Sequence, residues 1–266
     1  MAKRETRAIR KDTQSRRKHR ENENYSAFTK KQNTNNVVDF NQPHQVLNPQ
    51  KRQQKPIELL PQSINQEKYI LALTNPDTDI VVVSGPAGSG KTYLAMLAAI
   101  DAMRKGNCDK IILTRPAVSV DEEKHGFLPG DLNSKMEPWV RPLFDILREY
   151  YNAKELEYMM SEQIIEIAPL AFCRGRTFKN SWIICDEMQN ASPNQCKMIM
   201  TRIGENSKII ITGDTDQTDR TFHENGLLDL KNRISKYEVF GMTACEFDHR
   251  DIRRHKIIEH VLRMYN

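Results

Sequence analysis

Gly85-Pro86-Ala87-Gly88-Ser89-Gly90-Lys91-Thr92 is the stretch that decides the fold of this chain. It fits the pattern G-x-x-x-x-G-K-[ST], with the β-branched run 80–83 (IVVV) before it and a helical segment expected over about 91–105 after it. Glycines let the backbone curl so that N–H groups point inward at phosphate oxygens, and the helix N-terminus adds its positive dipole end. The stretch therefore predicts a phosphate-binding loop between a strand and a helix.

Two side chains of this loop have separate expected roles. Lys91 is expected to place its charge against the β- and γ-phosphates of a nucleotide, and the Thr92 hydroxyl is expected to ligate Mg²⁺. ATP and Mg²⁺ are the predicted cofactors. GTP is not expected, because no N-K-x-D-like segment that would read guanine is present. A merely flexible glycine turn is the alternative. The loop contributes to the predicted nucleotide-binding set Gly85, Pro86, Ala87, Gly88, Ser89, Gly90, Lys91, Thr92 and the adjacent Tyr93.

A second motif is the apolar run 181–185 (SWIIC), which ends in Asp186 and Glu187. Asp186 is expected to lie beside the phosphate loop and to hold Mg²⁺ through its water shell. Glu187 is then placed to polarise the attacking water, which favours hydrolysis over transfer to a metabolite. An apolar strand that merely ends in two acids is the alternative, and the preceding phosphate loop disfavours it.

A third apolar run, 209–211, is followed by Thr212-Gly213-Asp214-Thr215-Asp216-Gln217. Ligands of open α/β sheets bind at the carboxyl ends of the strands, where these polar residues are expected. Asp214 and Gln217 are therefore predicted to contact the γ-phosphate or its attacking water.

The order of segments indicates an α/β fold, a mostly parallel sheet with helices on both faces. Further strands are expected around 111–113, 164–165, 182–185 and 208–211, and further helices over 64–75 and 252–264. Residues 1–55 are rich in Arg, Lys, Gln, Asn and Glu and poor in aliphatic residues, so they are expected to form a largely disordered basic tail. Residues 56–266 are the expected working domain.

Charge is concentrated in that tail. Residues 1–20 have a net charge of +7, which leaves −2 for the other 246 residues of a chain whose total is +5. Such a tail can contact single-stranded nucleic acid through phosphates, or it can be a solvated, non-specific tail. Five scattered cysteines without a C-x-x-C pair argue against a disulfide framework or a zinc site. We expect a cytoplasmic protein, since no signal sequence or membrane-spanning run is found.

Several motifs taken together resemble the PhoH-like ATPases, whose core is similar to the RecA-like domain of superfamily 1 helicases. The resemblance covers about residues 57–265 and rests on the phosphate loop and on these segments: Thr114-Arg115-Pro116-Ala117, Gly126-Phe127-Leu128-Pro129-Gly130, Arg174-Gly175-Arg176-Thr177-Phe178, Asp186-Glu187-Met188-Gln189-Asn190, Thr212-Gly213-Asp214 with Gln217, and Asp251-Ile252-Arg253-Arg254-His255. It implies a RecA-like P-loop NTPase fold for the domain.

The resemblance also implies roles for residues outside the loop. Gln66 is expected to read the adenine edge, with a surface helix glutamine as the alternative. Arg115, Arg176 and Arg254 are candidates for contacts with the γ-phosphate or with nucleic acid, and Arg254 is favoured as an arginine finger. Any of these arginines can instead be a structural ion-pair partner.

An arginine finger can come from a neighbouring subunit, and only one RecA-like domain is expected here. We therefore expect a homo-oligomer, with a hexameric ring as the hypothesis. Some PhoH-like proteins carry a nuclease domain ahead of the ATPase; the polar tail leaves no room for one, so nuclease activity is not expected.

Three functions remain open on the sequence. The first is an ATP-hydrolysing motor or remodeller that acts on single-stranded RNA or DNA, and the near-neutral core weakens it because strand-tracking channels need positive charge. The second is an ATP-dependent switch or scaffold without motor activity. The third, a small-molecule kinase, is disfavoured by Asp186, Glu187 and Gln217.

Overall fold

A computed structural model of the chain describes residues 55–116, 132–217 and 225–253, together with residues 257 and 264. Side chains are described for all of these except 132–140. The described residues belong to one unit, which spans residues 53–266. Apart from Lys55, the predicted basic tail lies outside the described residues, as does the segment 126–130.

The centre of this unit is a sheet in which all strand pairings are parallel. The strands follow the order β3-β2-β4-β5-β1-β6. Strand β5 therefore lies between β1 and β4, and the carboxyl ends of the three strands meet at one edge. Their bounds are β1 Ile80–Ser84, β2 Lys110–Arg115, β3 Ile165–Pro169, β4 Ser181–Cys185, β5 Lys208–Gly213 and β6 Met242–Glu246.

The central strands are apolar along their length because both faces of the sheet are covered. Alternate residues of β4 and β5 contribute to two separate cores, with Ile184 and Ile210 in one and Ile183 and Ile209 in the other. All four are fully buried. This is the pattern expected for parallel strands covered by helices on both sides.

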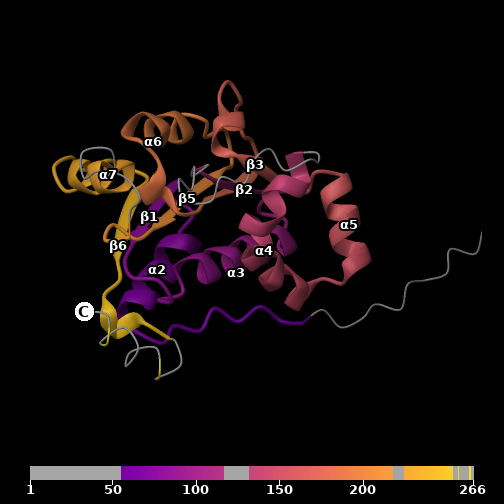
Figure 1. Cartoon of the computed structure of the whole chain (residues 1–266), viewed down its shortest axis with the longest axis horizontal. Coiled ribbons are helices and arrows are strands. Elements are labelled where there is room, and N and C mark those ends of the chain that lie inside the picture. Colours follow the sequence, from indigo (N-terminus) through magenta and orange to yellow (C-terminus); the bar gives the residue numbers. More distant parts are fainter. Residues whose placement is uncertain (1–54, 117–131, 218–224, 254–256, 258–263, 265–266) are drawn as a thin grey trace, which may run out of the picture. The chain divides into compact units, whose positions relative to one another are not determined.

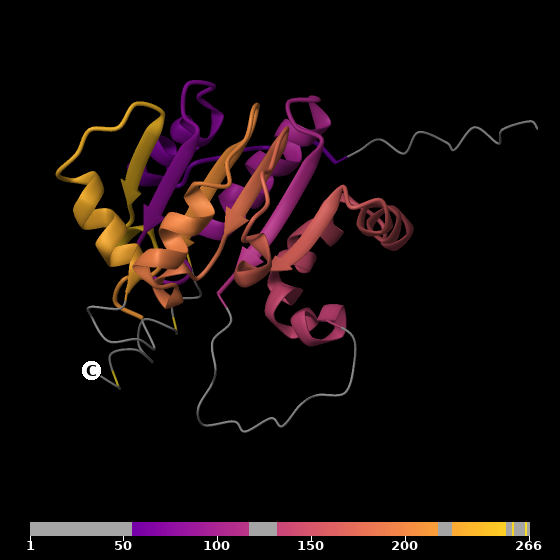
Figure 2. The same cartoon turned by 90° about the horizontal axis from the view of Figure 1, so that it is seen from above.

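Helices α2–α5 contribute the side chains of the first core, and Figures 1 and 2 show them on one side of the sheet. On the other side of the sheet, α6, α7 and the short helices η1 and η2 contribute side chains to the second core. The bounds are α2 Ile64–Thr74, α3 Lys91–Arg104, α4 Leu132–Tyr150, α5 Ala153–Ser161, η1 Leu170–Cys173, η2 Met188–Asn190, α6 Pro193–Met200, α7 Gly226–Ile234 and η4 His249–Asp251.

The predicted fold class is confirmed, and the boundaries of single elements differ from prediction in a few places. Helix α2 ends one residue early, at Thr74, because Asn75 adopts an extended conformation as its C-cap. The helix predicted from residue 252 does not begin there, since Ile252 is extended after η4; most of that segment lies outside the described residues. No helix in the described part of the chain is both long and apolar enough to cross a bilayer.

Lys208, at the start of β5, connects α2 to the sheet through hydrogen bonds. The residue is only 8% exposed, and its ammonium donates hydrogen bonds of 2.8 Å to the carbonyl oxygens of Leu73 and Asn75, where α2 ends. It also lies over the ring of Trp182, 5.4 Å from the ring centre. Burial lowers the pKa of Lys208 to about 8, although the nearby Asp79 carboxylate opposes this change.

The pH dependence of stability tests this buried lysine. The pKa of Lys208 is about 8 in the folded protein, against 10.5 without burial, so between these values the unfolded chain binds more protons than the folded one. The free energy of unfolding of the wild type should therefore rise from about pH 8 to about pH 10 relative to Lys208→Met, which lacks this titration. Urea unfolding across this range measures the difference, and Lys105→Met, at an exposed lysine, is the control. A constant difference between wild type and Lys208→Met would contradict the expectation.

Candidate functional site

The loop 85–92 joins the carboxyl end of β1 to α3. Gly85, Gly88 and Gly90 have φ angles of +147°, +82° and +88°, in which L-residues with side chains are strained. At Gly85 a Cβ atom would also lie 2.5 Å from the carbonyl oxygen of Phe247. The glycines are therefore needed for this turn, as the motif predicted.

Lys91 places its ammonium inside the curve of the loop. Its Nζ atom donates to the carbonyl oxygens of Gly85 at 2.6 Å and Pro86 at 2.8 Å, and the residue is only 8% exposed. Helix α3 begins here with Gly90 as N-cap, and no side chain caps its first N–H groups. The loop thus gathers a buried positive charge and a helix N-terminus that favours anions.

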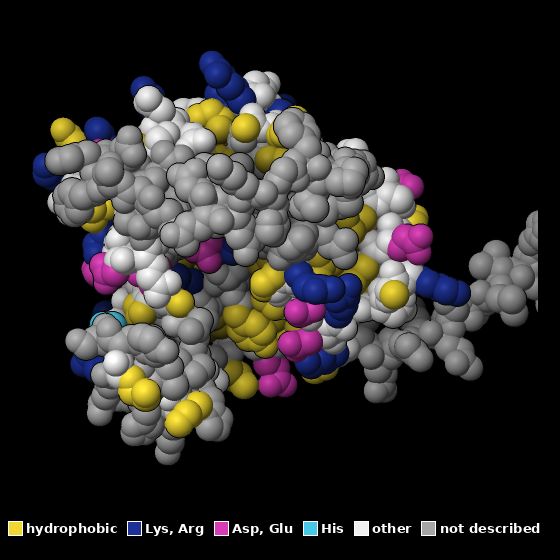
Figure 3. Space-filling model, viewed as in Figure 1, with side chains coloured by type: hydrophobic (Ala, Val, Ile, Leu, Met, Phe, Trp, Pro, Cys, Tyr) yellow, Lys and Arg dark blue, Asp and Glu magenta, His cyan; other side chains and the backbone are white. Residues whose placement is uncertain are grey.

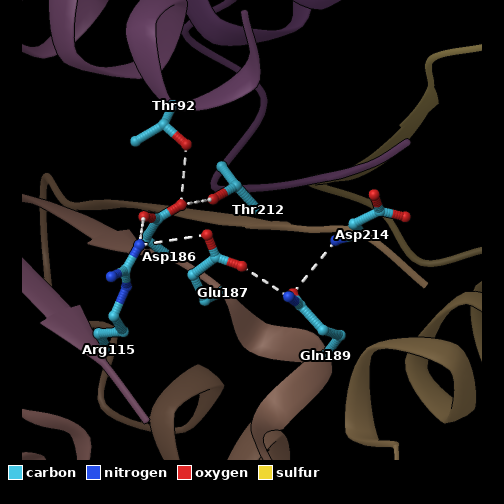
Figure 4. A network of polar contacts seen from close by, with 7 residues as sticks. All are labelled: Thr92, Arg115, Asp186, Glu187, Gln189, Thr212 and Asp214. Carbon is cyan, nitrogen blue, oxygen red and sulfur yellow. Dashed lines mark hydrogen bonds and ion pairs between the residues drawn. The ribbon is translucent and has the colours of Figure 1, made fainter. Parts of the chain in front are cut away.

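The Asp186 carboxylate lies at the end of β4, opposite the start of α3 (Figure 4). Its Oδ1 atom accepts hydrogen bonds from the hydroxyls of Thr92 at 2.8 Å and Thr212 at 2.6 Å. Asp186 is 6% exposed, and these donors satisfy one of its oxygens. A hydroxyl and a carboxylate oxygen side by side are the kind of ligands that Mg²⁺ takes in proteins.

Glu187 follows in a left-handed conformation, with φ +55° and ψ +39°. Its Oε1 atom accepts a hydrogen bond from Nη2 of Arg115 at 3.2 Å, and its Oε2 atom accepts one from Nε2 of Gln189 at 2.5 Å. The same Nη2 atom of Arg115 lies 2.9 Å from Oδ2 of Asp186. One guanidinium therefore bridges the two acids, and both carboxylate oxygens of Glu187 are held.

A chain of hydrogen bonds continues from Glu187 through Gln189 to Asp214, after β5 (Figure 4), and from there back to the loop. Oε1 of Gln189 accepts from the backbone N–H of Asp214 at 3.1 Å. The Asp214 carboxylate accepts from the backbone N–H of Ala87 at 3.2 Å. Gly213 allows the close approach, because a Cβ atom there would lie 2.5 Å from Oε1 of Gln189.

A cavity of about 260 Å³ lies over these groups, and most of the predicted site residues line it. Gln217 is exposed at its wall, and Tyr93 is 41% exposed at its margin. The lining residues are Ala87, Gly88, Gly90, Lys91, Thr92, Tyr93, Asp186, Glu187, Gly213, Asp214 and Gln217. The structure thus brings together the residues of three motifs that are far apart in the sequence.

Gln66 does not line this cavity. It is 4% exposed, so the alternative of a surface helix glutamine is wrong. Its Nε2 atom donates to the carbonyl oxygen of Ser89 at 2.9 Å, and its Oε1 atom accepts from the backbone N–H of Gln62 at 2.8 Å. Gln66 thus supports the phosphate loop from the side of α2, and its amide already has two partners there.

Of the two other predicted arginines, the structure describes Arg176 but not Arg254. Arg176 forms an ion pair with Glu166, with N–O distances of 2.5 and 2.9 Å, and it is not among the cavity residues. Hydrogen bonds from Arg176 lower the pKa of Glu166. Its contacts are those of a structural ion pair, the alternative left open on the sequence. Arg254 lies outside the described residues.

Three residues contribute to the site although the sequence assigned them no role. Thr212 and Gln189 donate to the two acids, and Arg253 donates its backbone N–H to the carbonyl oxygen of Gly88 at 2.9 Å. Thr212 and Gln189 lie within recognisable motifs: Thr212 directly follows an apolar run, and Gln189 stands two residues after Glu187. For the backbone contact of Arg253 the sequence holds no signal.

The strand order and the contents of this edge define the class of the domain. A glycine loop follows β1, two acids follow β4, and β5 lies between these strands with Asp214 after it. This is the arrangement of a RecA-like P-loop domain.

Comparison with known proteins gives the family. A family model described as PhoH-like protein matches residues 58–266, and the chain belongs to that family. It is 42% identical over 203 residues to a PhoH-like protein of Synechocystis, covering 76% of this chain and 61% of the relative. It is 43% identical over 205 residues to a PhoH-like protein of Bacillus subtilis, covering 77% and 63%. Protein PhoH of Escherichia coli is 36% identical over 204 residues, covering 76% and 56%.

The chain thus spans about 60% of the length of the curated relatives it matches. Among solved structures, the Hef helicase domain of Pyrococcus furiosus aligns with a TM-score of 0.42 at 13% identity, covering 71% of this chain and 38% of that one. The SWI2/SNF2 ATPase core of Sulfolobus solfataricus aligns with a TM-score of 0.38 at 12% identity, covering 61% and 34%.

Replacing the bridging guanidinium should destabilise the domain. Arg115→Ala leaves Asp186, whose side chain is 8% exposed, without its cationic partner, and such a loss costs about 3 kcal/mol or more in a buried pair. We expect the midpoint of thermal unfolding to fall by roughly 5 to 10 °C. Arg148→Ala removes an exposed ion pair with Asp145 and should change the midpoint little. Equal midpoints for the two variants would show that the bridge does not stabilise the site.

Proposed function

We propose that this chain is a Mg²⁺-dependent ATPase that couples hydrolysis to action on single-stranded RNA or DNA. The observation that carries the proposal is the meeting of Thr92 and Asp186, 2.8 Å apart, beside the buried ammonium of Lys91. A hard cation and a polyphosphate are the ligands that suit these groups. We also place the protein in the cytoplasm.

In this proposal, the loop binds the phosphates. The N–H groups at the start of α3 and the ammonium of Lys91 contact the β- and γ-phosphates, so Lys91 must exchange its carbonyl partners at Gly85 and Pro86 for phosphate oxygens. Thr92 and Asp186 hold Mg²⁺, which when bound neutralises charge on the phosphate oxygens. Tyr93, at the cavity margin, completes the proposed nucleotide site. Gln66 is proposed to read the adenine edge, for which its amide must exchange its partners at Ser89 and Gln62.

Hydrolysis requires a group that accepts a proton from water. As the water oxygen bonds to the γ-phosphorus and the bond to the bridging oxygen breaks, the Glu187 carboxylate takes the proton. Arg115 and Gln189 orient this carboxylate, because each donates to one of its oxygens. Asp214 and Gln217, at the cavity wall, are proposed to contact the γ-phosphate or the water.

Action on single strands is supported by the helicase-like fold and by the basic residues 1–20. The second candidate is a switch or scaffold that changes partners with its nucleotide state, and it uses the same site. Stimulation of turnover by a strand separates the two.

Phosphate release tests the proposed chemistry. Without any phosphate acceptor, the wild type should release inorganic phosphate from MgATP, whereas Lys91→Ala and Glu187→Gln should each lose at least about 100-fold in rate. Glu187→Gln replaces the carboxylate by an amide of nearly the same size and should still bind nucleotide. Lys236→Ala, at an exposed lysine of the loop before β6, is the control and should keep full activity.

Single-stranded RNA or DNA added at two salt concentrations decides between motor and switch. Salt-sensitive stimulation supports action on strands, while Lys91-dependent turnover that is indifferent to strands supports the switch. Turnover that survives Lys91→Ala would rule out this site as its source.

The site is proposed to be completed by a neighbouring subunit in a hexameric ring, with Arg254 as the arginine finger. Light scattering after size-exclusion chromatography should then show an oligomer in the presence of nucleotide. Mixing Arg254→Ala with Glu187→Gln should restore part of the turnover, because some mixed interfaces combine an intact finger with an intact base. Only monomer with nucleotide, at an active concentration, would contradict the ring.

A further inference from the structure

The helix η1 and the two residues after it form an exposed surface at the edge of the sheet that carries the nucleotide cavity. Phe172 is 57% exposed, and Arg174, two residues further along the chain, is also exposed. Gly175 follows with φ +79°, and nothing lies within 4 Å of where its Cβ would be. We call Phe172 and Arg174 the η1 platform. Figure 1 shows the segment between β3 and β4 projecting at the top, and Figure 3, in the same view, shows Lys or Arg beside hydrophobic side chains there.

The η1 platform carries a positive charge that no contact with another described side chain neutralises. Within the described residues, neither side chain of the platform has an ion pair or a side-chain hydrogen bond, while the nearby Arg176 is held by Glu166 and stacks on Phe178. The segment 170–179 contains Arg174, Arg176 and Lys179 and no acidic residue. One exposed aromatic ring alone is ordinary for a surface. An exposed ring and an unpaired guanidinium two residues apart are the kinds of group that hold an unstacked base and a phosphate of one strand.

The platform is also connected to the catalytic acids. Sγ of Cys173, between Phe172 and Arg174, lies 3.7 Å from the Thr114 hydroxyl at the end of β2. The carbonyl oxygen of Thr114 accepts the backbone N–H of Asp186 at 2.9 Å, and the next residue, Arg115, bridges the two acids. A ligand that shifts η1 therefore acts on the segment that positions Glu187.

We propose that the η1 platform binds single-stranded nucleic acid, with a base stacked on Phe172 and a phosphate on Arg174, and that strand binding there stimulates ATP turnover through Thr114 and Arg115. This inference rests on the proposed action on single strands and names the surface that engages the strand. It places strand and nucleotide at the same edge of the sheet, where open α/β folds bind their ligands.

Fluorescence anisotropy with labelled 20-mers of uridine and of deoxythymidine tests the platform on the full chain. Phe172→Ala and Arg174→Ala should each weaken strand binding at least about fivefold. Arg174→Ala should also reduce the slope of log K against log salt by about 0.7, whereas Phe172→Ala should leave this slope unchanged, because only the arginine releases a counterion. Both variants should keep the ATP turnover of wild type without strand and lose its stimulation.

Matched controls lie on α5, whose buried side chains belong to the core on the other face of the sheet. Tyr158→Ala removes an aromatic ring that is 60% exposed, and Lys154→Ala removes an exposed charge; neither should weaken binding. If wild type binds strands and the platform variants bind equally well, the platform is not the site, while the proposed function stands. If wild type neither binds nor responds to strands, the nucleic-acid part of the proposed function fails, and the platform with it. Equal competition by polyglutamate of matched charge would show a surface for acidic peptides and would overturn the stacking of a base.

Discussion

The Asp186 carboxylate is the contact on which the arrangement of this edge depends. One of its oxygens joins Thr92 of α3 and Thr212 of β5, and the other meets Arg115 of β2, so a single buried group connects the ends of three elements to β4. A nearly buried carboxylate is stable only where donors and a cation surround it. The sheet order supplies them, because β4 lies between β2 and β5.

The network that surrounds this contact connects the acids to the segment after β5 and to the phosphate loop. Gln189 connects Glu187 to the backbone of Asp214, and Asp214 connects to the backbone of Ala87 in the phosphate loop. A network of this kind is rigid when all of its members are paired and costly when one is lost. A change at one group that lines the cavity can therefore reach the acids, the segment after β5 and the loop through neighbouring contacts.

The sequence predicted those features of the site that depend on local order along the chain. The phosphate loop and the two acids follow strands that are recognisable from apolar runs, and the fold class follows from their alternation with helices. Strand β6 was missed because it lies at the sheet edge and none of its residues is fully buried. The partners of Arg176 and Gln66 depend on which segments the fold brings beside them, Glu166 in one case and Ser89 in the other. No spacing in the sequence indicates such contacts.

The strand order also bears on how the chain acquires its structure during synthesis. Strand β1 pairs with β5 and β6, and Ile80 is opposite Ile209, about 130 residues further along the chain. At a typical rate of roughly 5 to 20 residues per second, the ribosome needs on the order of 10 s to supply the first of these neighbours. During that time the run from Ile80 to Val83, which precedes the phosphate loop, has both of its edges unpaired. A nascent chain of this kind is a natural client for chaperones that shield apolar strands.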